Sequence, residues 1–282
     1  MNGWHYTPLS PSDETRLGKQ LTRWLTLWDW MVAPEFEGLD LIPQQGPVLL
    51  VGNHSLMAFA DASLMMRAIW QERGILCRSL ALHGHFKLPV WGRMLAASGA
   101  VDGTRENCTA MMQAGEHIIV YPGGGGEVMK RKGEQHTLRW KNRTGFARMA
   151  IQNGCTVVPF STVGADDCYD ILWDNRDMQS SRIGQKLVQL SGLKPEEFPP
   201  LLKGWGPTLI PKPQKMYFRF HEPIDASAFQ GMDPDDGAWA LRQQVEHTVN
   251  EGLSDLLARR QAHGQDSLTR RLARRLVKTL QG

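Results

Sequence analysis

Residues 48–54 read VLLVGNH, a β-branched and aliphatic run that ends in glycine, asparagine and histidine. Runs of this composition are typical of strands that are buried on both faces of a parallel sheet, so we expect a strand at 48–52. A helix-like stretch follows at 60–73, and the alternation continues along the chain. Further strands are expected at 78–82, 117–121 and 156–160, and further helices at 105–114 and 143–152. This alternation predicts an α/β fold with a mixed, mostly parallel central sheet flanked by helices.

Amphipathic helices are expected at both ends of the chain. From 12 to 33, apolar residues recur at helical spacing until Pro34, and they are Leu17, Leu21, Trp24, Trp28 and Met31. Tryptophans crowd the second half of this helix, which suits either packing on the core or contact with lipid headgroups. After Gly264, leucines recur every fourth residue with arginines between them, which predicts a basic amphipathic helix.

Three parts of the chain can be distinguished. They are an N-terminal tryptophan-rich amphipathic helix at 1–38, a main domain at 39–228, and C-terminal helices with a basic amphipathic tail at 229–282. Within the main domain, 174–215 is proline-rich and is expected to be a less regular insertion or cap. A late strand is expected at 216–220, and Asp233-Pro234 predicts the start of a helix.

The charge is distributed unevenly. The net charge is +3, yet residues 259–282 hold seven basic residues against Asp266, which leaves −3 for the rest of the chain. A basic tail indicates an anionic surface as partner, either phospholipid or nucleic acid. No zinc finger or RNP-like aromatic strand accompanies the tail, so we expect a phospholipid surface and no nucleic acid.

Membrane contact should be peripheral, because the chain has no run of about 20 apolar residues. The first ten residues, MNGWHYTPLS, lack the pattern of a secretory signal, which favours the cytoplasmic face of a membrane. Four widely spaced cysteines predict reduced core thiols rather than a zinc or redox site. The pair His83 and His85 is expected to be structural, so no metal is expected. The sequence does not indicate an oligomeric state.

His54 and Asp61 are the first candidates for chemistry. The expected strand delivers His54 into a loop, and Asp61 follows at the start of the next helix. Removing a proton from a hydroxyl near neutral pH suits an imidazole base, and a carboxylate can orient the ring and stabilise its protonated form. The alternative is that Asn53-His54 is only a loop anchor.

The second candidate is the glycine turn (residues 121–127), which follows an apolar strand and reads Tyr121-Pro122-Gly123-Gly124-Gly125-Gly126-Glu127. Four consecutive glycines let backbone N–H groups approach a phosphate or an oxyanion. The alternative is a flexible turn. The glycine turn is not a Walker loop, because no Lys-Ser or Lys-Thr follows at the required position, and it does not match a dinucleotide fingerprint.

Two shorter blocks complete the pattern. In Gly99-Ala100-Val101-Asp102-Gly103-Thr104-Arg105, a strand-like run ends in Arg105, which is suited to phosphate through its planar fork or is a solvated residue at a helix start. In Val157-Val158-Pro159-Phe160, Pro159 lies where a strand is expected to meet its loop.

Together these blocks resemble the four ordered motifs of the glycerolipid (lysophospholipid) acyltransferase superfamily. Residues 121–170 look like its diacylglycerol acyltransferase-like branch, through Trp140-Lys141-Asn142-Arg143-Thr144-Gly145-Phe146 and Val163-Gly164-Ala165-Asp166-Asp167 among others. The resemblance covers about residues 47–224, roughly two-thirds of the chain. It implies O-acyl transfer from acyl-CoA or acyl carrier protein to a lipid hydroxyl, without a covalent acyl-enzyme and without a cofactor.

By that resemblance, His54 is the general base and Asp61 orients it. Substrate-binding roles fall to Asn53, Arg105, Pro122, Gly123, Gly124, Gly125, Gly126, Glu127 and Pro159. The chain departs from the family pattern in two places. Six residues separate His54 from Asp61, where the family has four or five, so the loop must bulge or Asp61 is not the partner. The glycine turn also lacks the acidic and basic side chains of the phosphatidate-forming branch.

The second departure favours a neutral acceptor, either an acylglycerol or a long-chain alcohol. A lysophospholipid or 1-acylglycerol-3-phosphate acyltransferase is the alternative within this class, because Arg105 is suited to a phosphate. A catalytically silent membrane-binding scaffold is the alternative from another class, because of the unusual spacing and the amphipathic ends.

Overall fold

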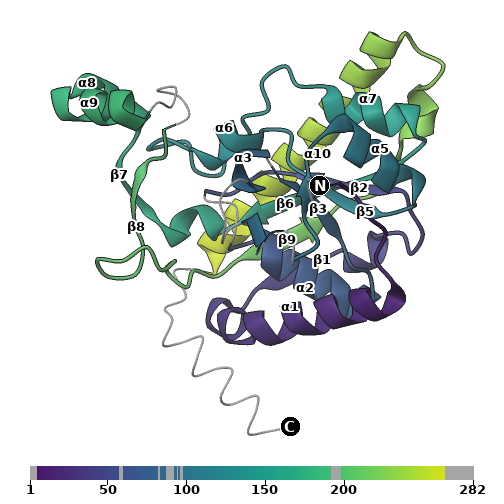
Figure 1. Cartoon of the computed structure of the whole chain (residues 1–282), viewed down its shortest axis with the longest axis horizontal. Helices are drawn as coiled ribbons and strands as arrows, with labels where there is room; N and C mark the ends of the chain where they lie inside the picture. The colour runs from purple at the N-terminus through teal and green to yellow at the C-terminus, as the bar shows by residue number, and fades with distance from the viewer. Residues whose placement is uncertain are drawn as a thin grey trace, which may run out of the picture.

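The computed structural model describes residues 5–56, 60–81, 83–86, 92–93, 95, 98–191 and 198–263 (Figure 1). Its elements in chain order are α1 (Pro11–Val32), β1 (Glu35–Glu37), η1 (Leu39–Leu41), β2 (Val48–Gly52), α2 (Ala62–Arg73), β3 (Arg78–Ala81), α3 (His83–Phe86), β4 (Val101–Asp102), α5 (Arg105–Gln113), β5 (His117–Val120), α6 (Gly124–Val128), α7 (Gly145–Gln152), β6 (Thr156–Val163), η2 (Ala165–Cys168), β7 (Asp170–Trp173), α8 (Asn175–Ser180), α9 (Arg182–Ser191), β8 (Leu201–Lys203), β9 (Tyr217–Phe220), β10 (Ile224–Asp225), η4 (Ala226–Phe229) and α10 (Pro234–Ala262).

The main sheet has the strand order β1-β9-β6-β2-β5-β3-β4, with β10 paired to the start of β6. Neighbouring strands are parallel except at β9–β6 and β10–β6, which are antiparallel. The mixed, mostly parallel sheet confirms the predicted fold class. The sheet also places the carboxyl ends of β2, β5 and β6 side by side at one edge.

The strand β2 lies at the centre of this sheet and is buried along its whole length. Its side chains alternate between two cores, as the two-residue period of a strand requires. Leu49 and Val51 pack with residues of α5, α7 and α10. Val48 and Leu50 pack with residues of α1 and α2 on the opposite face. Helices on both faces explain why this segment is continuously apolar in sequence.

The helix α1 packs on α2 through a face that includes only part of the predicted apolar stripe, namely Leu21 and Trp28. Its buried residues are Gly18, Leu25 and Val32, and a Cβ atom at Gly18 would overlap the Trp70 ring. Trp24 is 72% exposed and points away from this face, as does Leu27. The close approach of the two helices at glycine therefore sets the rotation of α1, and a spacing rule based on the large residues misses it.

Residues 170–203 form a separate unit beside the main sheet. The strands β7 and β8 pair only with each other, and the hairpin carries α8 and α9. The expectation of less regular structure is wrong for 175–191, because Asp174 and Asp177 form a capping box that begins α8.

The helix α10 begins as predicted, with Asp233 as the N-cap and Pro234 in the first turn. It contacts β6 along the sheet and is the longest helix of the described chain. The basic amphipathic helix predicted after Gly264 lies outside the described residues. Of the helices that are described, none combines the length and the apolar character that crossing a bilayer requires. All four cysteines are free and buried, as predicted.

Candidate active site

His54 lies at the carboxyl edge of the sheet, two residues beyond β2. Because β2 and β5 are parallel neighbours, the segment that follows β5 reaches the same edge. There the imidazole stacks on the Tyr121 ring, with centroids 3.8 Å apart and ring planes 4° apart. The strand order thus brings His54 and the glycine turn together.

Burial holds the His54 imidazole neutral. Desolvation, with a smaller contribution from the positive charge of Lys130, lowers its pKa to about 3. The ring atom Nδ1 is buried and has no hydrogen-bond partner among the residues that the structure describes. Buried polar atoms are nearly always hydrogen-bonded, so an unpaired Nδ1 marks this ring as a functional candidate.

The Asp61 carboxylate does not reach this nitrogen. Its Oδ1 accepts hydrogen bonds from the Ser55 hydroxyl at 2.7 Å and from the Ala62 N–H at 2.8 Å. Its Oδ2 accepts one from the Thr162 hydroxyl at 3.2 Å. The expected hydrogen bond between His54 and Asp61 is therefore absent, because Asp61 is the N-cap of α2 and its oxygens are already occupied. Burial raises the pKa of this carboxyl, and the bond from Ser55 opposes that shift.

The glycine turn is not a flexible loop, because its last residues form the short helix α6. The Arg143 guanidinium fixes its start by donating to the carbonyl oxygens of Pro122 at 3.0 Å and Gly123 at 2.6 Å. A Cβ atom at Gly123 would overlap the Glu127 carboxylate, and Gly124 has a φ of 51°. Glycine is thus required at these two positions, one for space and one for backbone conformation.

Glu127 is fully buried behind the glycine turn. Its carboxylate accepts a hydrogen bond from the backbone N–H of His54, and its Oε1 lies 3.4 Å from the N–H of Arg139. Its Oε2 has no partner. Burial raises the pKa of Glu127 to about 7, although the charge of Lys130 opposes the shift.

A buried ion pair between Lys130 and Asp166 connects the loop after His54 with the segment after the glycine turn. The Lys130 Nζ lies 2.6 Å from the Asp166 Oδ2, and both side chains are almost completely buried. Asp166 also accepts hydrogen bonds from the Leu56 N–H at 2.6 Å and the His136 N–H at 2.7 Å. The carboxylate therefore ties the loop after His54 to the segment after the glycine turn.

Asn53 and Pro159 belong to the framework under His54. The Asn53 amide donates to the Thr162 carbonyl at 2.9 Å and accepts from the Thr162 N–H at 2.8 Å, which extends the β2–β6 ladder by one pair. Pro159 lies inside β6, opposite Val51, and its carbonyl accepts from the His221 N–H at 2.9 Å. Both residues fix the strands next to His54, because the Asn53 amide and the Pro159 carbonyl already have hydrogen-bond partners in neighbouring strands or loops.

Arg105 lies on the same edge of the sheet but further out. It begins α5 directly after β4 and is exposed. Two strand spacings, about 10 Å, separate β4 from β5, the strand that leads into the glycine turn. The structure therefore does not place Arg105 in contact with the glycine turn.

Sequence reasoning missed several residues of this site. Tyr121 was recognised as the first residue of the glycine turn, but its ring contact with His54 depends on strand order. The pKa of Tyr121 is raised well above its usual value by burial and by the charges of Asp61 and Glu127, so its hydroxyl stays protonated. The Lys130–Asp166 pair spans 36 positions, and no local signal predicts it.

The part of the chain that the structure describes holds no cluster of three or more His, Cys, Asp or Glu residues suited to a metal ion. His83 instead pairs with Asp102, with 2.7 Å between Nδ1 and Oδ2.

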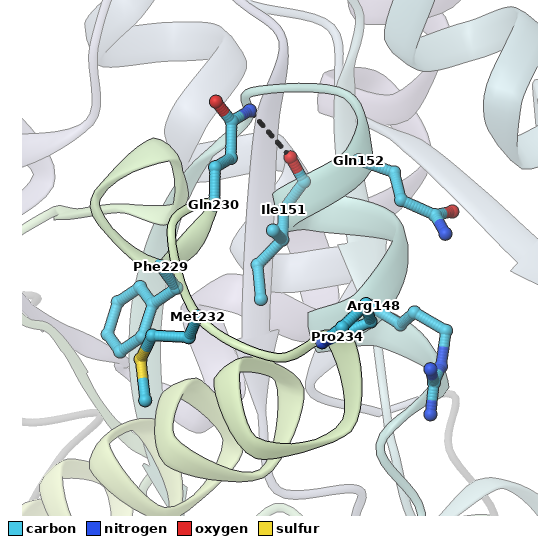
Figure 2. Close-up of a pocket in the computed structure, with 7 residues that line it drawn as sticks. All are labelled: Arg148, Ile151, Gln152, Phe229, Gln230, Met232 and Pro234. Atoms are coloured by element: carbon cyan, nitrogen blue, oxygen red, sulfur yellow. Dashed lines mark hydrogen bonds between the residues drawn. The ribbon is translucent and has the colours of Figure 1, made fainter.

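A separate pocket of about 320 Å³ lies between α7 and the start of α10 (Figure 2). It is lined by Arg148, Ile151, Gln152, Phe229, Gln230, Met232 and Pro234. The Gln230 amide bridges its rim by donating to the Ile151 carbonyl at 2.9 Å. The end of α7 leads into the amino end of β6, so this pocket lies on the edge of the sheet opposite His54.

Comparison with known proteins identifies the family and the fold. Residues 20–227 match the family model described as diacylglycerol acyltransferase. The chain is 30% identical over 260 residues to phytyl ester synthase 1, chloroplastic, of Arabidopsis thaliana, which is 86% of this chain and 37% of that protein. It is 32% identical over 141 residues to the Homo sapiens protein named DGAT1/2-independent enzyme synthesizing storage lipids, which is 49% of this chain and 43% of that protein. The chain thus matches well under half the length of either relative.

A solved structure shares the fold. The crystal structure of the 1-acyl-sn-glycerophosphate (LPA) acyltransferase PlsC from Thermotoga maritima matches with a TM-score of 0.55 and 18% sequence identity. The match covers 87% of this chain and 80% of that one. It supports the architecture of the sheet and helices, and at this identity it supports nothing finer.

Proposed function

The chain belongs to the diacylglycerol acyltransferase family, as its motif order indicated, and we propose that it transfers a fatty acyl group from a thioester to a lipid hydroxyl. The observation that carries this proposal is the position of His54, a neutral imidazole stacked on Tyr121 beside the glycine turn. A neutral imidazole at a sheet edge is equipped to accept a proton from a hydroxyl group.

In the proposed reaction, the acceptor hydroxyl first hydrogen-bonds to His54. The imidazole takes the hydroxyl proton while the oxygen attacks the thioester carbonyl carbon, so that an O–C bond forms and the carbonyl becomes an oxyanion. The oxyanion then collapses and the C–S bond breaks. The departing thiolate takes the proton from the imidazolium, which leaves an ester and a free thiol. A serine nucleophile has no support, because the chain has no Gly-x-Ser-x-Gly elbow.

One set of groups would lower the barrier, and Asp61 has a positioning role. At the first turn of α6 the Gly124 N–H already donates to the Tyr121 carbonyl at 3.0 Å, so we assign the oxyanion to the N–H groups of Gly125 and Gly126. Asp61 and Glu127 both act electrostatically on Tyr121, against which the His54 ring stacks, whereas the charge that acts on His54 itself is that of Lys130. We assign Asp61 a positioning role through its bonds to Ser55 and Thr162, in place of a direct bond to His54.

A neutral acceptor is favoured. The glycine turn itself contains no basic side chain, the Arg143 guanidinium beside it donates to the carbonyls of Pro122 and Gly123, and Arg105 lies about two strand spacings away. The plant relative is named a phytyl ester synthase and the human relative is named for storage-lipid synthesis. These names suit an acceptor that is a long-chain alcohol or an acylglycerol, with acyl-CoA or acyl carrier protein as donor.

We place the reaction at a phospholipid surface with peripheral attachment, on the cytoplasmic face. The exposed Trp24 and Leu27 on α1 support this, because tryptophan suits the headgroup region. The basic residues beyond 264 support it through charge alone.

The test is turnover by the purified full chain. Acyl-CoA is supplied with phytol, diacylglycerol or lysophosphatidate in separate reactions, and both free thiol and extracted lipid products are measured. We expect ester formation with a neutral acceptor, and His54→Ala should lower it at least a hundredfold. His247→Ala is the matched control, because that histidine is exposed on α10 far along the chain from the site. Full activity of His54→Ala would refute the mechanism.

Two alternatives are separated by the same assay. Arg105, exposed at the carboxyl edge, favours a 1-acylglycerol-3-phosphate acceptor, and lysophosphatidate would then be the best substrate with a strong loss in Arg105→Ala. The missing His54–Asp61 bond favours a catalytically silent membrane-binding scaffold. Such a protein would bind liposomes and release no thiol with any acceptor.

A further inference from the structure

The β7–β8 hairpin with α8 and α9, followed by the turn that ends at residue 212, forms an arm beside the main sheet. Figure 1 shows α8 and α9 together at the far end of the hairpin, clear of the helices that cover the sheet. The arm begins directly after η2, which follows the carboxyl end of β6. It therefore leaves the body at the same edge of the sheet as His54.

The outer face of α9 is apolar and exposed. Ile183 is 70% exposed and Leu190 is 76% exposed, and Leu187 between them is exposed as well. At 100° per residue these three side chains fall within an arc of about 60°. The face toward α8 is instead formed by the buried Gly184 and Val188. The three exposed side chains of this apolar stripe therefore do not take part in the packing of α9 on α8.

A second apolar group lies at the turn after β8. The turn is closed by backbone hydrogen bonds from Gly204 to Thr208 and from Trp205 to Ile210, both 2.7 Å long. It exposes Trp205, Leu209 and Ile210. An ordered turn that presents one tryptophan and two aliphatic residues is suited to the interface between lipid headgroups and acyl chains.

The charge of the arm as a whole is nearly balanced, with six basic and five acidic residues over 170–212, and its positive charge is concentrated on α9. That helix holds Arg182 and Lys186 and no acidic residue, whereas Arg176 and Asp177 lie on α8 and Lys203 lies on β8. Asp177 pairs with Lys132 and Arg176 lies near Glu134. No ion pair in the described chain involves Arg182, Lys186 or Lys203. On α9, Arg182 and Lys186 flank the apolar stripe, as in helices that lie in a membrane surface.

The base of the arm packs directly on the loop that carries His54. Leu56, two residues after His54, is buried against Ile171 of β7 and Leu202 of β8. The N–H of Leu56 is also held by Asp166, in the short helix that precedes β7. The base of the arm is therefore fixed relative to the proposed catalytic loop.

We propose that the arm docks on an anionic phospholipid bilayer through the stripe of Ile183, Leu187 and Leu190, which lies at the opposite end of the β7–β8 hairpin from the turn at 204–210. This inference rests on the proposed function, because the acyl acceptor is then a lipid of the bilayer on which the arm docks. The packing of Leu56 on the hairpin sets the position of His54 relative to the membrane plane.

The experiment compares two double variants of the full chain. Ile183→Glu with Leu190→Glu adds two charges to the stripe, and Gln185→Glu with Gln189→Glu adds the same two charges to the opposite face of α9. Each protein is floated with vesicles of phosphatidylcholine and phosphatidylglycerol, and its melting temperature and elution volume are measured. Turnover is measured with acceptor embedded in vesicles and with a short water-soluble alcohol.

The stripe variant should bind vesicles at least about fivefold more weakly than wild type, while the opposite-face variant stays within about twofold. It should lose turnover on embedded acceptor and retain turnover on the soluble alcohol. Equal vesicle binding by both variants would overturn the proposal, whatever the turnover. A stripe variant that changes the elution volume but not vesicle binding would also overturn it, since the stripe then meets a second copy of the chain. Failure of the acyl-transfer proposal is distinguishable, because turnover on the soluble alcohol would be absent in wild type as well.

Discussion

Glu127 is a buried carboxyl whose pKa is raised in the folded chain, so its contribution to stability depends on pH. Its pKa is raised to about 7 by burial, against 4.5 for the ordinary side chain. Between these two values the folded chain holds a proton that the unfolded chain has released, so rising pH favours unfolding. The difference in pKa corresponds to roughly 3 kcal/mol of stability lost between about pH 4.5 and pH 7.

Glu127→Gln should abolish that loss. We expect the free energy of unfolding of the variant, relative to wild type, to rise by roughly 3 kcal/mol from pH 4.5 to pH 8, as measured by urea unfolding at several pH values. Glu106→Gln, at an exposed position on α5, controls for the loss of one negative charge. A difference between variant and wild type that is the same at every pH would contradict the assignment.

The glycine turn allows a test with a matched pair of substitutions. Gly123→Ala places a Cβ atom in the space of the Glu127 carboxylate, whereas a Cβ atom at Gly126 would meet no atom within 4 Å. We expect Gly123→Ala to cost about 1–3 kcal/mol of stability through overpacking and to lower kcat/KM at least tenfold. Gly126→Ala should retain activity and stabilise α6 slightly, because alanine is the better helix former by up to about 1 kcal/mol.

Thermal unfolding and acyl-transfer kinetics on the same preparations measure both effects. Shortening the opposing side chain with Glu127→Asp should restore part of the stability of Gly123→Ala, since the two residues compete for one space. Equal losses in Gly123→Ala and Gly126→Ala would instead mean that the turn needs glycine only for flexibility.

At the scale of elements, the contact of α1 with α2 depends on a glycine. Alanine normally stabilises a helix relative to glycine by about 1 kcal/mol. At Gly18 we expect the opposite sign, a loss of about 1–3 kcal/mol, because the added methyl group would overlap the Trp70 ring. A double-mutant cycle of Gly18→Ala with Trp70→Leu, measured by urea unfolding, should recover most of the loss. Independent, additive effects would show that the two helices do not meet there.

The strands β2, β3, β5, β6 and β9 of the main sheet could be predicted from sequence because their apolar runs are bounded by glycine, proline and polar residues, whereas the short strands β1 and β10 were not predicted. The end of β6 could not be predicted, because a proline such as Pro159 usually marks the end of a strand. The strand continues to Val163, since β9 pairs with it from Phe160 onward. Pairing with a distant segment, which no local pattern contains, therefore extends the strand.

The location of the candidate site could be predicted from the sequence, but its hydrogen bonds could not. Parallel strands required His54 and the glycine turn to share an edge of the sheet. The expected bond from Asp61 depended on where the following helix begins. The helix was expected from residue 60 and begins at Ala62, which makes Asp61 its N-cap and occupies its oxygens. A shift of two residues in a helix boundary thus removes a predicted catalytic pair.

At the scale of the whole molecule, two kinds of membrane contact should respond differently to salt. Deleting residues 265–282 removes five basic residues and Asp266, a net loss of four positive charges. Each basic residue near an anionic surface contributes about 1 kcal/mol, and this attraction is screened as the Debye length falls from about 10 Å at 0.1 M salt to about 3 Å at 1 M. The stripe on α9 acts through apolar burial, which salt does not screen in this way.

The deletion variant should therefore bind vesicles containing phosphatidylglycerol at least about tenfold more weakly than the full chain at 0.1 M salt, and nearly equally at 1 M. Ile183→Ser with Leu190→Ser, which adds no charge, should weaken binding by a similar factor at both salt concentrations. Flotation with pure phosphatidylcholine vesicles is the control, because there the deletion should have little effect. If the deletion weakens binding equally at both salt concentrations, the tail acts through apolar contacts, and its charge asymmetry has no part in membrane attachment.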